Sequence, residues 1–220
     1  AHEIKNPLTS IRSAVETIRR VEDPAQKEKL MAIIADDIQR LDRLISDISA
    51  ASRVDAELSR AKLEPVRLDQ LLKTMVEVHW ATQGGNGPAL GLDLALDVPL
   101  AVRGVEGRLV QVFRNLIANA QSFSPPGGTI TLGARAGAGI VIAIVADEGP
   151  GIPEGSENAI FERFYSARPE GEKFGIHSGL GLSISRQIVA AHGGTICAEN
   201  RRDETGRILG ARFLVTLPAA

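Results

Sequence analysis

Apolar residues in the first quarter of the chain recur at the spacing of a helix seam. They follow intervals of four and three residues over 4–18, and a second stripe of nearly the same period runs over 30–51. Between the stripes, Asp23 and Pro24 form a helix start, because aspartate caps helices and proline suits the first helical position. The pattern predicts a helical hairpin. One hairpin cannot bury stripes this wide, so we expect a dimeric four-helix bundle.

The pattern of polar and apolar positions changes after residue 61. Pro65 cannot continue a helix, so residues 62–65 are expected to form a linker. Helices and strands then interleave, with helices predicted at 68–81, 109–122 and 179–192 and strands at 92–96, 129–134, 140–146, 195–200 and 210–217. The fold class is therefore α plus α/β, with a helical domain at 1–63 and an α/β sandwich at 64–220.

Composition narrows the classes of partner. Lys and Arg total 25 and Asp and Glu total 27, which gives a formal net charge of −2. This balance gives no electrostatic reason to expect a nucleic acid or an anionic membrane as partner. The sequence has no apolar run of about 18 residues, so no membrane segment is expected in it. Cys197 stands alone in an apolar stretch, which fits a reducing compartment and predicts an inert, buried thiol.

Five short segments carry the residues with chemical potential. Each alone has an ordinary explanation: a histidine on a charged helix face, polar residues on a helix, a β-turn, an aromatic anchor and a helix start. No P-loop consensus is present in the sequence. In chain order the segments are His2-Glu3-Ile4-Lys5-Asn6-Pro7, Asn115-Leu116-Ile117-Ala118-Asn119-Ala120, Asp147-Glu148-Gly149-Pro150-Gly151, Phe161-Glu162-Arg163-Phe164-Tyr165 and Gly179-Leu180-Gly181-Leu182.

In this order the segments resemble the transmitter region of sensor histidine kinases, where they are called the H, N, G1, F and G2 boxes. The resemblance covers essentially all 220 residues, and residues 164–185 are similar to alphaproteobacterial ChvG-type sensors. It implies that the α/β sandwich is an ATP-binding domain of the Bergerat fold. It also implies ATP-dependent autophosphorylation of a histidine, phosphotransfer to an aspartate of a response regulator, and phosphatase activity.

His2, Glu3 and Asn6 are the expected catalytic residues. A neutral imidazole is a nucleophile near neutral pH, and an adjacent carboxylate can orient the ring and take up its proton. Asn6 lies four residues after His2, on the same helix face. The resemblance implies that His2 accepts the γ-phosphoryl group of ATP with Glu3 as general base. It gives Asn6 the placing of a water that dephosphorylates the regulator.

Asn115 and Asn119 also share one helix face. In the resembling family a carboxamide oxygen here binds Mg²⁺, and we expect Asn119 to be the direct ligand and Asn115 its partner. Many relatives carry a cation three residues later, where this chain has Ser122. The resemblance therefore predicts a replacement cation from the following lid, with Arg168 first and Lys173 second.

The other expected nucleotide contacts lie at the base and at the phosphates. By resemblance, Asp147 accepts a hydrogen bond from the adenine amino group, which guanine lacks. Gly149 and Gly151 let the backbone approach the base. Phe164 precedes the lid, expected at 166–178. The free N–H groups of a helix start suit phosphates, and this one comprises Gly179, Leu180, Gly181 and Leu182.

Two other functions remain open at this point. One is an ATPase or serine kinase of the wider Hsp90-like superfamily, against which the His2 segment on a dimer-forming hairpin argues. The other is a degenerate, non-enzymatic dimerising scaffold, which only the altered cation positions favour. His79, His177 and His192 have no ligand partners at metal spacing and are interpreted as structural or lid residues.

The expected cofactors are ATP and Mg²⁺, and the expected partners are a second copy of the chain and a cognate response regulator, with no nucleic acid. Helical periodicity is already running at His2 without a cap before it. We therefore expect the chain to be part of a longer protein. The resemblance implies that this protein is an inner-membrane sensor with this region on the cytoplasmic side.

Overall fold

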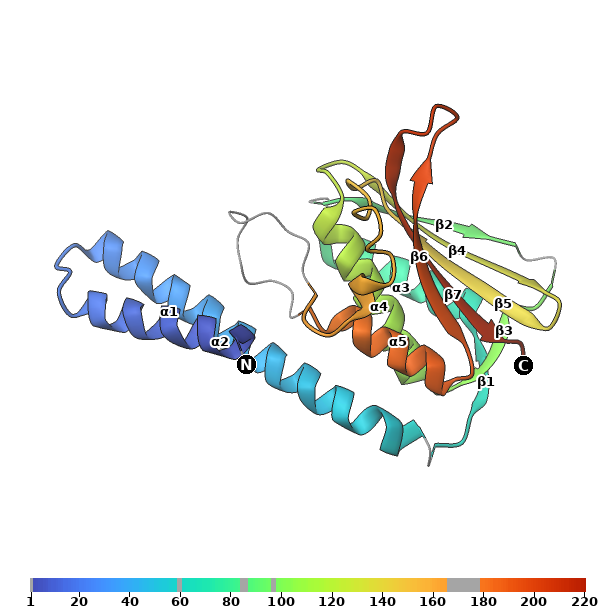
Figure 1. Cartoon of the computed structure of the whole chain (residues 1–220), viewed down its shortest axis with the longest axis horizontal. Coiled ribbons are helices and arrows are strands. Elements are labelled where there is room, and N and C mark those ends of the chain that lie inside the picture. Colours follow the sequence, from blue (N-terminus) through green and yellow to red (C-terminus); the bar gives the residue numbers. More distant parts are fainter. Residues whose placement is uncertain (1, 59–60, 84–86, 96–97, 166–178) are drawn as a thin grey trace.

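The computed structural model describes the chain except for residues 1, 59–60, 84–86, 96–97 and 166–178. A helical hairpin comes first, and an α/β part follows in which helices cover one face of a sheet (Figure 1). This order confirms the predicted fold class. The second hairpin helix also contacts a helix of the α/β part.

The hairpin consists of α1 (His2–Ile18) and α2 (Pro24–Leu58). Asp23 caps α2 as predicted, because its carboxylate accepts a hydrogen bond from the Ala25 N–H at 3.0 Å. Ala14 of α1 and Leu44 of α2 are buried. The short connection at residues 19–23 therefore turns the chain so that the two helices pack against each other.

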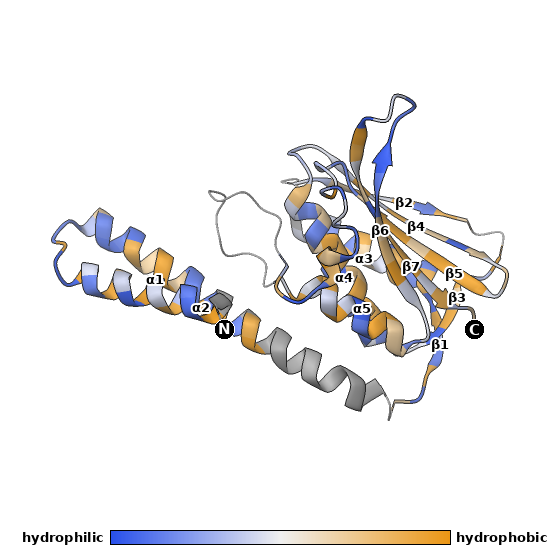
Figure 2. Cartoon of the chain, viewed as in Figure 1, coloured by the Kyte–Doolittle hydropathy of each residue, from blue (hydrophilic) through white to orange (hydrophobic). Residues whose placement is uncertain are grey.

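Several large apolar side chains of the hairpin stay exposed on the single chain. Leu8 is 51% exposed and Met31 is 62% exposed. In Figure 2 the coloured parts of the hairpin helices carry both hydrophobic and hydrophilic segments. One hairpin therefore leaves much of both stripes uncovered. The exposed set, among the described side chains, is Ile4, Leu8, Val15, Met31, Ile33, Ile38 and Ile45.

The α/β part is built on a mixed five-stranded sheet in the order β2-β4-β5-β7-β6. Only β2 and β4 are parallel, and the other neighbouring pairs are antiparallel. Ala138 and Gly139 form the two-residue turn between β4 and β5, both with the positive φ that a type I′ hairpin turn requires. The bounds are β2 (Ala89–Leu94), β4 (Thr129–Gly137), β5 (Ile140–Ala146), β6 (Thr195–Arg202) and β7 (Ile208–Pro218).

A second, two-stranded sheet joins β1 (Glu64–Arg67) to β3 (Ala101–Gly104) in antiparallel register. The prediction of a linker at 62–65 is therefore wrong for Glu64 and Pro65, which pair with Gly104 and Arg103. Proline fits because this short sheet has only edge strands. Four-residue strands with charged residues carry too little periodicity to be read from sequence.

Helices α3 (Leu68–Gln83), α4 (Glu106–Phe123) and α5 (Gly181–Ala191) lie against one face of the five-stranded sheet (Figure 1). Along β5 the side chains alternate, so Val141, Ala143 and Val145 are fully buried beneath the helices. Ile142 and Ile144 point to the opposite face and are half-buried. We call this opposite face the outer face.

His192 joins two of these helices at their ends. It follows α5, and its ring accepts a hydrogen bond from the Val105 N–H at 3.0 Å through Nε2. Nδ1 donates to the Ile188 carbonyl at 2.8 Å, so the neutral tautomer with a proton on Nδ1 satisfies both contacts. Val105 is the N-cap of α4. The structural interpretation of His192 is confirmed, and His79 likewise contacts Gln121 and the Pro88 carbonyl. His177 lies outside the described residues.

The prediction of a buried Cys197 is wrong, because this residue is exposed. Strand alternation in β6 places Cys197 on the outer face and its neighbour Ala198 in the core. An apolar run was taken as evidence of burial, although only every second residue of this strand faces the helices.

Candidate active site

The expected phosphoacceptor residues lie at the beginning of the hairpin. His2 and Glu3 are in the first turn of α1, and Asn6 follows one turn later with an exposed side chain. Their spacing places His2 and Asn6 on one face of the helix. Pro7, next in the chain, is buried between the helices.

Asp147 lies immediately after β5, where the chain leaves the sheet, and is 3% exposed. Its Oδ1 accepts two backbone hydrogen bonds, from the Gly149 N–H at 2.9 Å and from the Ala211 N–H of β7 at 3.0 Å. The carboxylate is thereby fixed by its own turn and by a strand more than sixty residues away. Because both bonds use Oδ1, Oδ2 keeps its capacity to accept a hydrogen bond from a bound molecule.

Burial raises the pKa of Asp147 above its usual range, because the interior disfavours the charged form. The N–H groups of Ala211 and Gly149 and the positive charge of Arg201 act in the opposite direction. A buried carboxylate with a fixed orientation is a selective acceptor, since a ligand without a matching donor would leave it unpaired.

Gly149 and Gly151 stand where a side chain has no room. A Cβ on Gly149 would lie 2.8 Å from the Phe123 carbonyl oxygen, at the end of α4. Gly151 has φ +84°, and a Cβ there would lie 2.5 Å from the Asn200 side-chain oxygen. Both glycines are therefore required by close approach of neighbouring segments of the chain, and the approach of their backbone to a base stays a prediction.

Asn200 of β6 was not anticipated from the sequence. Its carboxamide forms two hydrogen bonds with the backbone of Ile152, accepting from the N–H at 2.6 Å and donating to the carbonyl at 2.9 Å. This pair holds the loop that follows Asp147 against the sheet. A polar residue at an inward position of a strand was the available signal, but its partner lies 48 residues away.

Asn115 connects α4 to the start of α5. Its side-chain nitrogen donates to the Gly181 carbonyl at 3.1 Å and lies 3.4 Å from the Ser185 hydroxyl. Ser185 is buried and itself donates to the Gly181 carbonyl at 2.8 Å. With its nitrogen engaged, Asn115 keeps its oxygen as a free acceptor, and half-buried Asn119 follows one turn later. Asn115 thus joins α4 to the start of α5, and Asn119 lies one turn further along α4.

The first turn of α5 offers backbone N–H groups. Its N-cap is Leu180, which makes no side-chain cap hydrogen bond. Leu180 is otherwise a core residue, 2% exposed, so its expected contribution to binding is limited to the backbone. Leu182 is half-buried. The backbone N–H groups of a first helical turn and the helix dipole make this end of α5 suited to an anionic group such as a phosphate.

Phe164 and Gly179 join the two ends of segment 166–178. The Phe164 N–H donates to the Gly179 carbonyl at 2.9 Å. Phe164 has φ +66°, which is unusual for a residue with a side chain, and Gly179 has φ +68°. A Cβ on Gly179 would lie 3.0 Å from the Phe164 Cα. This junction lies just before α5. Backbone in an unfavourable conformation often marks a functional site. The expected cations Arg168 and Lys173 lie outside the described residues.

Comparison with known families decides what this arrangement belongs to. Residues 104–220, just over half of the chain, match the family described as histidine kinase-, DNA gyrase B-, and HSP90-like ATPase. Residues 1–57 match the His Kinase A (phospho-acceptor) domain. The chain belongs to the histidine kinases. Within this family, the hairpin corresponds to the phosphoacceptor domain and the α/β part to the ATP-binding domain.

A curated relative of this histidine kinase is the Sensor protein ChvG of Rhizobium meliloti (strain 1021). The two are 50% identical over 226 residues, which cover 100% of this chain and 39% of the relative. The Agrobacterium fabrum ChvG is 48% identical, with 38% of its length covered. The predicted ChvG-type subgroup is therefore confirmed. The chain spans about two fifths of the length of these relatives.

Among solved structures, histidine kinase ThkA in complex with response regulator protein TrrA aligns with a TM-score of 0.73 at 25% identity, covering 100% of this chain and 60% of that chain. Full-length ShkA in complex with AMPPNP aligns with a TM-score of 0.68 at 26% identity, covering 100% of this chain and 44% of that chain. The arrangement of hairpin and α/β part is therefore one that other histidine kinases adopt.

Within the described part of the histidine kinase, no helix is both long and apolar enough to cross a membrane. The same residues contain no group of three or more His, Cys, Asp or Glu side chains that could hold a metal ion. Asn115 and Asn119 offer carboxamide oxygens on one face of α4. That donor set suits Mg²⁺, which prefers oxygen ligands and keeps several waters.

Proposed function

We propose that this histidine kinase phosphorylates His2 with ATP and passes the phosphoryl group to an aspartate of a response regulator. The supporting observation is the hydrogen bond of Asn115 to the start of α5, in the same domain as a buried, oriented Asp147. Such a site can bind an adenine at one end and phosphates at the other. His2 and Glu3 on α1 supply the nucleophile and base that a bare ATPase lacks.

The proposed first step moves one phosphoryl group. A ring nitrogen of His2 attacks the γ-phosphorus of ATP, the bond from that phosphorus to the bridging oxygen breaks, and ADP leaves. Glu3 takes up the ring proton as the nitrogen–phosphorus bond forms. In the second step an aspartate carboxylate of the regulator attacks the phosphorus, and the nitrogen–phosphorus bond breaks.

Asn119 is the proposed protein ligand of Mg²⁺, with Asn115 beside it. When bound, the ion neutralises phosphate charge and orients the γ-phosphoryl group. Asn119 can contribute a half-buried carboxamide oxygen, while Asn115 holds the start of α5 in place. Asp147, Gly149 and Gly151 are proposed to hold the adenine, and the Gly179–Leu182 backbone the phosphates.

The whole protein is proposed to be a homodimer. Ile4, Leu8 and Val15 lie on one heptad seam and stay exposed on the single chain, so a second hairpin could cover them. The domain division at 63/64 goes with this proposal, because β1 begins at Glu64 and starts the α/β part.

Two solved histidine kinase structures support the choice of partners. ThkA is described in complex with a response regulator, and ShkA in complex with AMPPNP. We extend both ligand classes, a regulator and an adenine nucleotide, to this chain. Asn6 is exposed one turn from His2, a position from which it could direct water at a phosphorylated regulator, so phosphatase activity is part of the proposal. The parent protein is proposed to be an inner-membrane sensor with this region on the cytoplasmic side.

The test is incubation of the chain with γ-labelled ATP and Mg²⁺. Label should appear on the protein, should be lost in acid as a phosphohistidine is, and should be absent from His2→Gln. The His2→Gln chain should still bind ADP, which separates a lost acceptor from a lost nucleotide site. Acid-stable label on Ser or Thr would instead identify a serine kinase, and no label together with no ADP binding would leave a scaffold.

A further inference from the structure

At Asp147 one backbone hydrogen bond of the β5–β7 ladder is replaced by a bond to a side chain. The last pair of the β5–β7 ladder is Ala146 and Arg212. One position further along, Asp147 lies opposite Ala211. The Asp147 N–H donates to the Ala211 carbonyl at 2.9 Å. In an antiparallel ladder the same two residues would also exchange the reverse bond, from the Ala211 N–H to the Asp147 carbonyl. Instead the Ala211 N–H donates to the Asp147 side-chain Oδ1.

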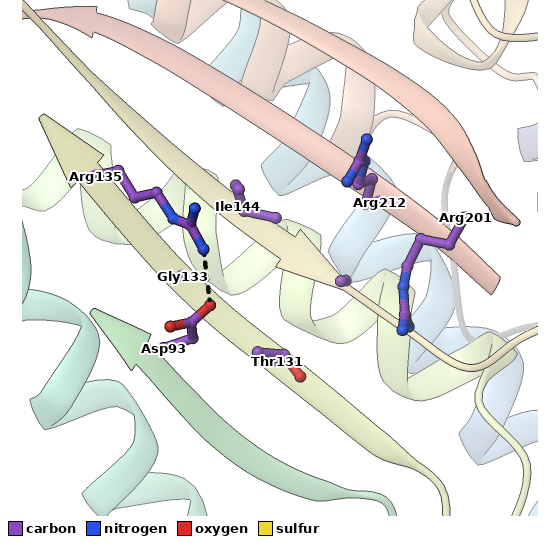
Figure 3. A pocket seen from close by; sticks show the side chains of 8 residues that line it. Asp93, Thr131, Gly133, Arg135, Ile144, Arg201 and Arg212 are labelled. Atoms are coloured by element: carbon purple, nitrogen blue, oxygen red, sulfur yellow. Dashed lines mark hydrogen bonds and ion pairs between the residues drawn. The ribbon is translucent and has the colours of Figure 1, made fainter. Parts of the chain in front are cut away.

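Arg201 supplies the donor for the Asp147 carbonyl that Ala211 does not supply. Its Nη1 donates to the Asp147 carbonyl at 2.8 Å. Arg201 belongs to β6, so its side chain crosses β7 to reach the end of β5. Figure 3 shows Arg201 extended over the outer face of the sheet. A buried peptide carbonyl without a donor destabilises a fold. Because Arg201 donates to the Asp147 carbonyl, the Ala211 N–H can bond to the side chain without leaving that carbonyl unsatisfied.

Gly210 opens the path for this side chain. It is the cross-strand neighbour of Arg201 in β7. A Cβ at Gly210 would lie 2.0 Å from the Asp147 carbonyl oxygen, and the residue has φ +143°. The backbone of β7 therefore approaches Asp147 as closely as only glycine permits. Arg201, Gly210 and Ala211 together determine both the peptide and the carboxylate of Asp147.

We infer that Arg201 is a positioning residue for adenine recognition, because it satisfies the Asp147 carbonyl and so leaves the Ala211 N–H to orient the carboxylate. The inference rests on the proposed function of Asp147 and extends it to a residue on the opposite, outer face. Without Arg201, the Ala211 N–H can return to the carbonyl, and the carboxylate loses one of its two fixed partners.

The positive charge of Arg201 supports the same role as its hydrogen bond, because both favour an ionised, oriented Asp147 carboxylate. The charged groups beside Asp147 are Arg201 from β6 and Glu148, its neighbour in the chain, whose carboxylate accepts a bond from the Thr129 N–H at 2.9 Å. β7 presents the Ala211 N–H and α4 presents the Phe123 carbonyl, neither of which titrates. The positive charge of Arg201 lowers the pKa of Asp147 against the raising effect of burial. It therefore favours the ionised carboxylate, which is the acceptor.

The test compares Arg201→Met and Arg201→Lys with a matched control, Arg135→Met. Arg135 lines the same outer-face hollow in Figure 3, but its partner is Asp93 at 3.3 Å. ADP affinity is measured by calorimetry at several pH values, with circular dichroism as the check on folding. We expect Arg201→Met to weaken ADP about tenfold at neutral pH, Arg201→Lys to weaken it about threefold, and Arg135→Met to leave it unchanged.

The pH profile separates positioning from general destabilisation. Binding should fall as pH drops through the pKa of Asp147, and in Arg201→Met this fall should occur at higher pH than in the wild type. A uniform loss at every pH, or an equal loss in Arg135→Met, would overturn the inference. So would wild-type affinity in Arg201→Met or, if that variant does not fold, in Arg201→Lys. A wild-type chain that does not bind ADP would instead overturn the proposed function.

Discussion

The side chain of Asn115 holds the first residue of α5, because its nitrogen donates to the Gly181 carbonyl at 3.1 Å. This bond spans 66 positions of the chain and joins α4 to the helix start that is proposed to bind phosphates. The same side chain thus contributes to packing and to the nucleotide site.

Asn115→Asp should weaken nucleotide binding and stability together. A carboxylate cannot donate to the Gly181 carbonyl and adds negative charge beside the proposed phosphate site. We expect a loss of about 1–3 kcal/mol in unfolding free energy by urea titration and roughly tenfold weaker ADP by calorimetry. Arg114→Ala, an exposed neighbour on the same helix, is the control and should change neither. Unaltered ADP affinity in Asn115→Asp would contradict the proposed role.

Asp147→Asn should abolish adenine binding without loss of stability at neutral pH. The amide oxygen can still accept from Ala211 and Gly149, but its NH₂ group would face the adenine amino group, donor against donor. Burial raises the pKa of Asp147, so the protonated form contributes stability that is complete below the usual value near 4. That stability is lost as pH rises through the raised pKa.

The urea-unfolding free energy of wild type minus that of Asp147→Asn should therefore decrease between pH 4 and the raised pKa, and then stay constant. Asp93→Asn, which changes an exposed carboxylate on the outer face to an amide, is measured alongside as the matched control. A difference that increases with pH would mean that the Asp147 carboxylate is stabilised, and not penalised, by its surroundings.

His192→Ala should destabilise the α/β domain and leave its chemistry intact. The substitution removes the acceptor of the half-buried Val105 N–H and leaves a cavity at the junction of α4 and α5, where the His192 ring is buried. An unsatisfied buried donor costs about 1–3 kcal/mol, measurable by urea unfolding. His79→Ala, at a half-buried histidine that water can replace, should cost less. Equal losses of unfolding free energy in His192→Ala and His79→Ala would show that burial of the histidine ring does not determine its contribution to stability.

Asn6→Ala should separate two activities of the hairpin. Asn6 shares a helix face with His2 but has no proton to take up, so autophosphorylation with γ-labelled ATP should continue at a similar rate. Dephosphorylation of the labelled regulator should slow, since its water would be less well placed. The proposed role fails if both rates fall by the same factor.

Arg168→Ala tests the replacement cation predicted from the sequence. The residue follows Ser166, where many relatives have an arginine, and Ser122 leaves the other usual cation position empty of charge. A bidentate arginine–phosphate contact contributes about 1.5–3 kcal/mol, so ATP should bind roughly ten- to a hundredfold more weakly, with a smaller loss for ADP. Lys173→Ala is the comparison variant. An effect confined to Lys173→Ala would transfer the role to that lysine.

Local pattern was sufficient for much of the fold. The predicted strand at 140–146 coincides with β5, and predictions for α3 and α4 are within a few residues of the observed ends. These elements have long, regular alternation or helical periodicity. The expected strand at 92–96 is displaced, since β2 runs from Ala89 to Leu94, and β1 and β3 were missed as strands.

The motifs located Asp147 and its glycines, yet they could not reveal what holds them. Asn200, Arg201 and Ala211 act through contacts that cross 48 to 64 positions of the chain. Nothing in the local pattern of β6 distinguishes an arginine that donates to a backbone carbonyl at the end of another strand from an arginine on a solvated face. Such pairings depend on strand order and register, which single-sequence periodicity does not determine.

The Phe164–Gly179 hydrogen bond also has a consequence for engineering. Because the two ends of segment 166–178 meet at this bond, the length of the segment between them can change without displacing α5 or the Asp147 turn. Doubling the number of residues between two joined ends costs only about 0.6 kcal/mol of closure entropy. The segment is therefore the natural insertion point for a fluorescent reporter or an epitope, and exchanging it between relatives is a practical route to kinases with altered nucleotide turnover on an unchanged scaffold.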